Sequence, residues 1–256
     1  MISIAIPSSA LINENDPKIK TFKIGLIARA CAIFRVEEII IYRDPRLNES
    51  NLIKDILEYA ETPQYLRKYI PLKQTLRYAG VIPPLKIPSH KPKRLKVGEL
   101  REGIVVRVGP DGTRWVDIGV KALAPLKSKA KRGARVTVRV CSKNPLVVEE
   151  AKPEEYWGYR VKLDELKNVL RRRNVIITSR RCDVPKIGDV RIGDDITLVF
   201  GSPEEGVFEI MERLGIEWEG ECWNIIPMQG VETVRLEEAI FATLSILNYV
   251  RWLNEV

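Results

Sequence analysis

The sequence is poor in the residues that most often carry enzyme chemistry or bind metals. It has one histidine, His90, and four cysteines that stand far apart without a C-x-x-C pair: Cys31, Cys141, Cys182 and Cys222. A structural zinc site is therefore not expected. A single histidine also disfavours Ser-His and Cys-His catalysis. An even number of cysteines could form two disulfides, but because nothing indicates secretion, we expect all four to be free thiols in a reducing compartment.

Long apolar runs are also missing. No stretch approaches the ~20 residues that a membrane helix needs. The first ten residues, MISIAIPSSA, lack the charged start and long apolar centre of a signal peptide. We therefore expect a soluble, cytoplasmic protein. Glutamine is scarce while 30% of the residues are charged, a bias that suits the ion-pair-rich surface of a thermophile's protein.

The positive charge is concentrated in one segment. Residues 85–143 hold 16 Lys and Arg against four acids, a net +12, whereas the whole chain carries +8, so the remainder is at −4. Such a field attracts a polyanion, and the phosphates of nucleic acid are the commonest one inside cells. The alternatives are a solvated thermophile surface and, less well matched to a strand-rich segment, an anionic membrane.

This segment also has its own texture. Four prolines follow Gly80, at Pro83, Pro84, Pro88 and Pro92, and indicate a linker. From 98 to about 155 come short β-branched runs separated by turns, with Asp111-Gly112 as a hairpin signal. Along 135–140, arginine and threonine alternate with valine, which gives one basic face. We expect four or five strands in a small OB-like barrel.

Both ends of the chain have α/β texture. Apolar runs at 3–7, 37–42, 174–178 and 195–200 predict buried strands, and one more strand is expected after Cys222. Helical recurrence is expected at 18–34, 51–60, 64–79, 163–172, 207–214 and 236–253, the last with a buried stripe of Ile240, Leu244, Leu247 and Val250. We predict one α/β domain, 1–88 with 157–256, interrupted by a basic β-barrel insert at 89–156.

Three strands in the C-terminal half run into small, polar loops, at 178–185, 200–206 and 226–233. Ligands of open parallel sheets bind beyond the carboxyl ends of the strands, so these loops are expected to form one pocket. The loop FGSPEEG matches neither the G-x-G-x-x-G fingerprint nor a P-loop, and its acids repel phosphate. A nucleoside cofactor without phosphates therefore fits better than a dinucleotide, which disfavours an oxidoreductase.

Three segments in order carry a family resemblance: KIGLIARACAIFRVEEIIIY at 23–42, LVFGSPEEGV at 198–207 and IPMQGVETVRLEEAIFATLSIL at 226–247. They resemble the motifs of SPOUT-class, or α/β-knot, RNA methyltransferases, in particular the archaeal and eukaryotic branch with an inserted β-barrel. The resemblance implies a C-terminal trefoil knot, S-adenosylmethionine bound in it, no metal, and a homodimer that completes the active site.

The resemblance also implies site residues. It places a catalytic arginine at Arg29, for which an ion-paired arginine on a helix surface is the alternative. The third motif has Thr233-Val234-Arg235 where ribose 2′-O enzymes keep a Ser-Leu-Asn-like triplet, and Pro203 alters the second motif, so ribose and base acceptors stay open. The implied cofactor-binding residues are Thr178, Ser179, Phe200, Gly201, Ser202, Glu205, Gly206, Ile226, Pro227, Met228, Gly230 and Thr233.

Candidate RNA contacts come from the basic segment and from the pocket loops. They are Lys91, Lys93, Arg94, Lys96, Lys129, Lys131, Arg132, Arg135, Arg139, Arg180, Arg181 and Arg235. Trp115 and Trp157 are candidates for base stacking or for the barrel core. The sequence thus predicts an S-adenosylmethionine-dependent methyltransferase acting on ribosomal or other structured RNA; the alternative is a non-catalytic RNA-binding or assembly factor of the same fold.

Overall fold

The computed structural model describes residues 1–91, 94–186 and 195–255. By its internal contacts the chain forms two compact units. The α/β unit comprises 1–61, 73–85 and 159–256, and the β unit comprises 62–72 and 86–158. No helix within the described ranges is both long and apolar enough to cross a membrane.

The α/β unit is built on a sheet of six parallel strands in the order β11-β9-β10-β1-β2-β8. Strands β1 and β2 are buried at every position, as expected for a parallel sheet covered on both faces. The bounds are β1 (Ile2–Pro7), β2 (Glu38–Tyr42), β8 (Arg160–Asp164), β9 (Val175–Thr178), β10 (Ile196–Val199) and β11 (Glu221–Trp223).

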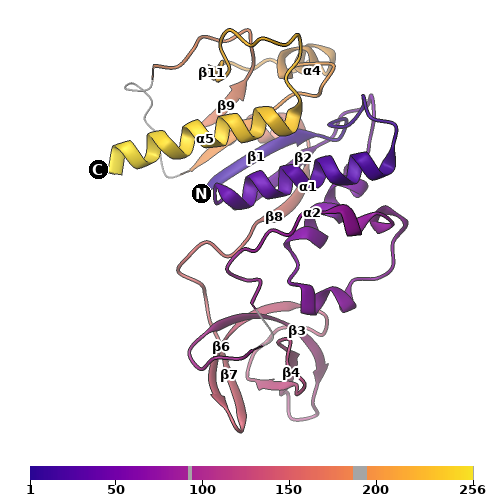
Figure 1. Cartoon of the computed structure of the whole chain (residues 1–256), viewed down its shortest axis with the longest axis vertical. Coiled ribbons are helices and arrows are strands. Elements are labelled where there is room, and N and C mark those ends of the chain that lie inside the picture. The colour runs from indigo at the N-terminus through magenta and orange to yellow at the C-terminus, as the bar shows by residue number, and fades with distance from the viewer. Residues whose placement is uncertain (92–93, 187–194, 256) are drawn as a thin grey trace. The chain divides into compact units, whose positions relative to one another are not determined.

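Helices cover both faces of this sheet. Helices α3 (Leu166–Val169) and α4 (Val207–Arg213) pack on one face. Helices α1 (Pro17–Ile33) and α5 (Leu236–Glu255) lie side by side across the other, as Figure 1 shows, and α2 (Ser50–Glu61) packs against α1. The predicted stripe of α5 is buried at all four positions.

Two of the helices predicted from the sequence were wrong. The expected helix at 64–79 is three 3-10 turns, η1 (Gln64–Tyr69), η2 (Gln74–Leu76) and η3 (Ala79–Val81). Pro71 lies between the first two, where it lacks an amide N–H and restricts the residue before it. The expected helix at 163–172 begins instead as the edge strand β8, paired with β2, and only the short α3 is helical.

The β unit is an antiparallel sheet in the order β5-β4-β3-β6-β7. Its edge strands β5 and β7 also contact each other, so the sheet is nearly closed. Its interior is formed mainly by valines from β3, β4, β6 and β7. The bounds are β3 (Leu100–Val108), β4 (Arg114–Asp117), β5 (Ala124–Leu126), β6 (Arg135–Lys143) and β7 (Leu146–Glu150).

The local signals in this unit were confirmed. Gly112 has a φ of 83°, and the Asp111 carboxylate accepts hydrogen bonds from the Thr113 backbone (3.1 Å) and hydroxyl (2.7 Å). This turn joins β3 to β4 as the Asp-Gly pair predicts. In β6 the valines at 136, 138 and 140 are buried, while the residues between them face outward.

The β unit contains charges that composition counts as surface. Arg101 is fully buried, and its guanidinium donates to Glu99 (2.7 Å), to the Ile118 carbonyl (3.0 Å) and to the Arg94 carbonyl (3.2 Å). The Glu102 carboxylate, 5% exposed, accepts from Trp157 Nε1 (2.6 Å) and from a side chain of β6. Two of the 16 basic residues at 85–143, Arg101 and Arg135, therefore bind carboxylates within the β unit.

The expectation of four free thiols was also wrong. Cys182 and Cys222 form a disulfide, with 5.6 Å between their Cα atoms, while Cys31 and Cys141 are free. Cys182 follows β9 and Cys222 lies in β11, and these two strands are neighbours. Residues 40 positions apart meet because of strand order, which spacing along the chain does not reveal.

Candidate functional site

The loops after β9, β10 and β11 meet at the carboxyl end of the sheet. The three strands are parallel neighbours, so their loops leave the sheet at the same edge. Together with the first turns of α5 they line a hollow of about 230 Å³. One water occupies ~30 Å³ in the liquid, so the hollow is ligand-sized rather than a packing defect.

Nine of the twelve predicted cofactor residues line this hollow: Thr178, Ser179, Phe200, Gly201, Ser202, Glu205, Gly206, Ile226 and Thr233. Pro227, Met228 and Gly230 are not among its lining residues. The Met228 side chain is 98% exposed, and its backbone has a positive φ of 52°.

The loop at 200–206 is tied to the sheet and to itself. The Phe200 amide donates to the Ala5 carbonyl (2.9 Å), and the buried Tyr42 hydroxyl donates to the Phe200 carbonyl (2.7 Å). A Cβ at Gly201 would lie 2.6 Å from the Glu205 carbonyl oxygen, so only glycine fits the observed backbone. Glycine at 201 thus lets the start of the loop pack directly against its end at 205–206.

The opposite wall contains residues that the sequence analysis did not single out. Trp223 ends β11 and Asn224 follows it, and Thr243 lies seven residues after the start of α5. The Trp223 carbonyl accepts from the Ser179 amide (3.1 Å), which joins two of the three loops. Thr243, 2% exposed, interrupts the apolar stripe of α5, and a polar residue in such a stripe is the signal that could have identified it.

The hollow has more acidic than basic lining residues. Four glutamates line it, at 204, 205, 209 and 232, against two arginines, Arg180 and Arg181. Arg181 pairs with Glu209, and Arg180 Nη1 donates to the Glu232 carbonyl (3.1 Å). Glu204 and Glu205 pair with two further arginines outside the lining, Arg46 and Arg213, so the four glutamates are matched by four arginines.

Comparison with known proteins decides the family. The family model described as "Putative RNA methyltransferase" matches residues 1–247. The chain belongs to this SPOUT-class RNA methyltransferase family. An uncharacterised protein of Haloarcula marismortui is 34% identical, over 96% of this chain and 98% of that protein. The human 28S rRNA (uridine-N(3))-methyltransferase is 30% identical, over 96% of this chain and 77% of that enzyme.

These comparisons confirm the prediction of an RNA methyltransferase at the level of the family. A solved RNA 2′-O ribose methyltransferase also aligns with 98% of this chain and 57% of its own, with 9% identity and a TM-score of 0.42.

In this member of the RNA methyltransferase family, Arg29 does not line the hollow. It lies on α1, where its Nη1 donates to the carbonyls of Pro84 (2.9 Å) and Leu85 (3.1 Å). Within one chain it therefore fixes the segment that follows η3. Its catalytic role remains a prediction.

The predicted RNA contacts of the β unit differ in their surroundings. Arg135 pairs with Glu102 (3.0 Å) and Arg139 with Glu149 (3.7 Å), so the basic face of β6 is partly neutralised. Lys91 lies 5.4 Å from the centre of the Trp157 ring. Arg94, Lys96, Lys129, Lys131 and Arg132 are exposed, as are Arg135 and Arg139. Lys93 lies outside the described residues, and Arg235 is exposed at the start of α5 in the other unit.

Proposed function

We propose that the protein is an S-adenosylmethionine-dependent methyltransferase of ribosomal RNA. The observation that carries the proposal is the hollow at the carboxyl ends of β9, β10 and β11. Two of the three loops that line it, at 200–206 and 226–233, lie in segments that resemble SPOUT motifs. The name of the human relative supports ribosomal RNA as the substrate.

The lining residues fit S-adenosylmethionine. Phe200, Trp223 and Ile226 offer apolar surface for an adenine ring, and Thr178 and Ser179 offer hydroxyl groups. The closed loop at 200–206, which requires glycine at 201, forms part of the lining. When bound, the cofactor supplies a methyl group on a sulfonium, and the protein's share is to hold it and the acceptor in position.

We further propose N3 of uridine as the acceptor atom. Two observations favour it over the ribose hydroxyl. The human, fruit-fly and mouse relatives are named uridine-N(3)-methyltransferases. The third motif here, Thr233-Val234-Arg235, also departs from the Ser-Leu-Asn-like triplet of the ribose enzymes. Arg180 and Arg181 at the edge of the hollow, with Arg235, would then hold RNA phosphates near it.

The β unit is proposed to be an OB-like RNA-binding barrel. Across the sheet, the order of the strands is β5-β4-β3-β6-β7, and the two edge strands β5 and β7 are in contact. Numbered by their order in the sequence, these are the unit's third, second, first, fourth and fifth strands, an order that matches an OB barrel. Exposed basic residues of this unit include those in two short stretches, 94–96 and 127–132. Phosphate contacts from these stretches would give most of the affinity and make it sensitive to salt.

A homodimer and a trefoil knot complete the proposal. The outer face of α5 exposes Phe241, Tyr249, Trp252 and Leu253, each more than 40% accessible, and Tyr249 stacks on Trp252 with 6.1 Å between ring centres. An apolar helix face of this size is typical of a protein interface, and we propose a second copy of the chain as its partner. The knot rests on the resemblance of the three motifs alone.

Calorimetry with S-adenosylmethionine tests the proposal, with Gly201→Ala as the disruptive variant. Gly80→Ala is the matched control, because a Cβ there has nothing within 4 Å. We expect binding by the wild-type protein and the control, and none by Gly201→Ala. Absence of wild-type binding at high micromolar concentration would refute the cofactor.

Incubation with ribosomal RNA and S-adenosylmethionine, followed by nucleoside mass spectrometry, tests the acceptor. A methyl group that stays on the base fragment supports N3, and one that stays on the sugar contradicts it. Cofactor binding without transfer to any ribosomal RNA would favour the non-catalytic RNA-binding factor.

A further inference from the structure

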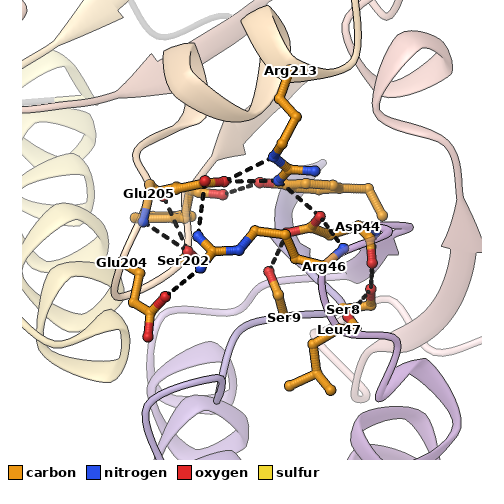
Figure 2. Close-up of polar contacts among 11 residues, drawn as sticks. Ser8, Ser9, Asp44, Arg46, Leu47, Ser202, Glu204, Glu205 and Arg213 are labelled. Carbon is orange, nitrogen blue, oxygen red and sulfur yellow. Dashed lines mark hydrogen bonds and ion pairs between the residues drawn. The ribbon is translucent and has the colours of Figure 1, made fainter.

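A closed network of charged side chains lies behind the loop at 200–206 (Figure 2). Its centre is Asp44, 1% exposed, which follows β2. The Asp44 carboxylate accepts from the Ser9 hydroxyl (2.5 Å) and from the Arg46 amide (3.0 Å). The Asp44 amide in turn donates to the Ser8 hydroxyl (2.9 Å). Asp44 is therefore fixed to the carboxyl ends of β1 and β2 by several bonds.

Arg213, the last residue of α4, joins this fixed carboxylate to the loop. Its Nη2 lies 2.9 Å from Asp44 Oδ1 and 2.7 Å from Glu205 Oε2, and its Nε donates to the same Glu205 oxygen at 3.2 Å. A guanidinium can hold two carboxylates at once because its donors form a rigid fork, which a lysine ammonium lacks.

Arg46 engages the rest of the loop's charge. Its Nη1 lies 2.8 Å from Glu205 Oε1, and its Nη2 lies 2.8 Å from Glu204 Oε2. Both carboxylate oxygens of Glu205 are thus bound, one by Arg46 and the other by Arg213. The Glu205 backbone meanwhile closes the loop: its carbonyl accepts from the Ser202 amide (2.8 Å), and its amide donates to the Ser202 hydroxyl (2.9 Å).

From this geometry we infer that Asp44 and Arg213 are positioning residues for the methyl donor, acting through Glu205 on the backbone of the loop at 201–206. The inference rests on the proposed function and extends it to residues that do not line the hollow. Asp44 supplies an immobile anchor, and Arg213 transmits its position to the loop. If the loop is ordered before the donor binds, the free energy of binding does not include the entropic cost of ordering it.

Loss of Arg213 should release Glu205 from its anchor. A tenfold change in Kd corresponds to ~1.4 kcal/mol, which is of the order of the free energy of ordering the backbone of a single residue. We therefore expect Arg213→Gln to raise the Kd for S-adenosylmethionine about tenfold, and to raise the KM for the donor with little change in kcat at saturation.

The chain contains a closely matched control. Glu38 begins β2 at the amino end of the sheet and, like Asp44, is 1% exposed. Arg172 pairs with it at 2.5 Å, and its side chain is 27% exposed against 29% for Arg213. The two arginines thus each pair with a buried carboxylate, but Arg172 lies at the sheet end opposite the hollow. Arg172→Gln removes such a pair far from the hollow, while Lys162 stays 2.5 Å from the Glu38 carboxylate and keeps it paired.

The test compares Arg213→Gln, Arg213→Lys and Arg172→Gln by calorimetry with S-adenosylmethionine. A raised Kd for Arg213→Gln, a smaller rise for Arg213→Lys and an unchanged Kd for Arg172→Gln support the inference. It is overturned if Arg213→Gln binds as tightly as the wild type, or if both glutamine variants weaken binding alike. Should Arg213→Gln fail to fold, the comparison of Arg213→Lys with Arg172→Gln decides in the same way.

Amide hydrogen exchange without any ligand separates this inference from the proposed function. The amides of Ser202 and Glu205 should exchange faster in Arg213→Gln than in Arg172→Gln, because both depend on the closed loop. Equal exchange in the two variants overturns the positioning role. Absence of donor binding by the wild type refutes the proposed function, and the exchange result still decides whether Arg213 orders the loop.

Discussion

Removal of the Cys182–Cys222 disulfide should destabilise the protein substantially. The bridge closes a loop with a sequence separation of 40 residues. In the chain-entropy description, a loop of that length adds ~4 kcal/mol to the stability at 25 °C. Strand β11, which contains Cys222, is only three residues long and lies at the edge of the sheet. When the bridge is absent, we therefore expect the backbone amides of β11 to be the first to lose their protection from hydrogen exchange.

Equilibrium unfolding in urea measures this effect. The double variant Cys182→Ser with Cys222→Ser is compared with the wild type, and reduction of the wild type provides a second route to the same state. Cys141→Ser is the matched control, because Cys141 is an exposed, free thiol on β6. Hydrogen exchange locates the loss, with residues 221–223 expected to exchange faster.

Two results would refute the reasoning. The thiols of the wild-type protein can be titrated after it is unfolded in denaturant without any reductant. A count of four thiols would show that the bridge does not form. A double variant that unfolds at the same urea concentration as the wild type, while the bridge is present in the latter, would show that strand pairing alone holds β11.

Two further perturbations follow from buried charges. Arg101→Met should cost ~3–5 kcal/mol by urea unfolding, because it leaves the Glu99 carboxylate without its 2.7 Å partner; a loss below ~1 kcal/mol would contradict the packing described. Burial raises the pKa of Asp44, but the Ser9 hydroxyl, the Arg46 amide and Arg213 outweigh it and hold the pKa below the usual 3.8. The charged form therefore stabilises the fold above the unfolded pKa, and this contribution is lost as the pH falls through the folded value. The deficit of Asp44→Asn relative to the wild type should thus be large at pH 7 and shrink at pH 3, and an equal deficit at both would contradict it.

Much of the architecture could be predicted from local sequence patterns. Continuous apolar runs marked the buried parallel strands β1, β2, β9 and β10, because such strands are covered on both faces. The Asp111-Gly112 pair fixed the turn between β3 and β4, since few residues adopt its backbone conformation. The three motifs at 23–42, 198–207 and 226–247, and their order along the chain, predicted the family.

Other elements failed because their cause lies elsewhere in the chain. The residues at 160–164 are a strand because β2 offers them an open edge of the sheet. The local pattern at 163–172 does not reveal this pairing, and by itself it predicted a helix. Arg101 belongs to the basic segment by sequence, yet it is fully buried against the carbonyls of Ile118 and Arg94. Charge counting measures how many arginines there are, whereas burial depends on what packs around each.

The sequence by itself thus determined the family, most strands and the loops that line the hollow, because these depend on residue types within short windows. Tertiary structure alone decided the disulfide and the network around Asp44. Arg213 and Asp44 are 169 positions apart and meet only because α4 and the end of β2 lie at the same edge of the sheet. Contacts between distant segments follow strand order, which periodicity and composition do not encode.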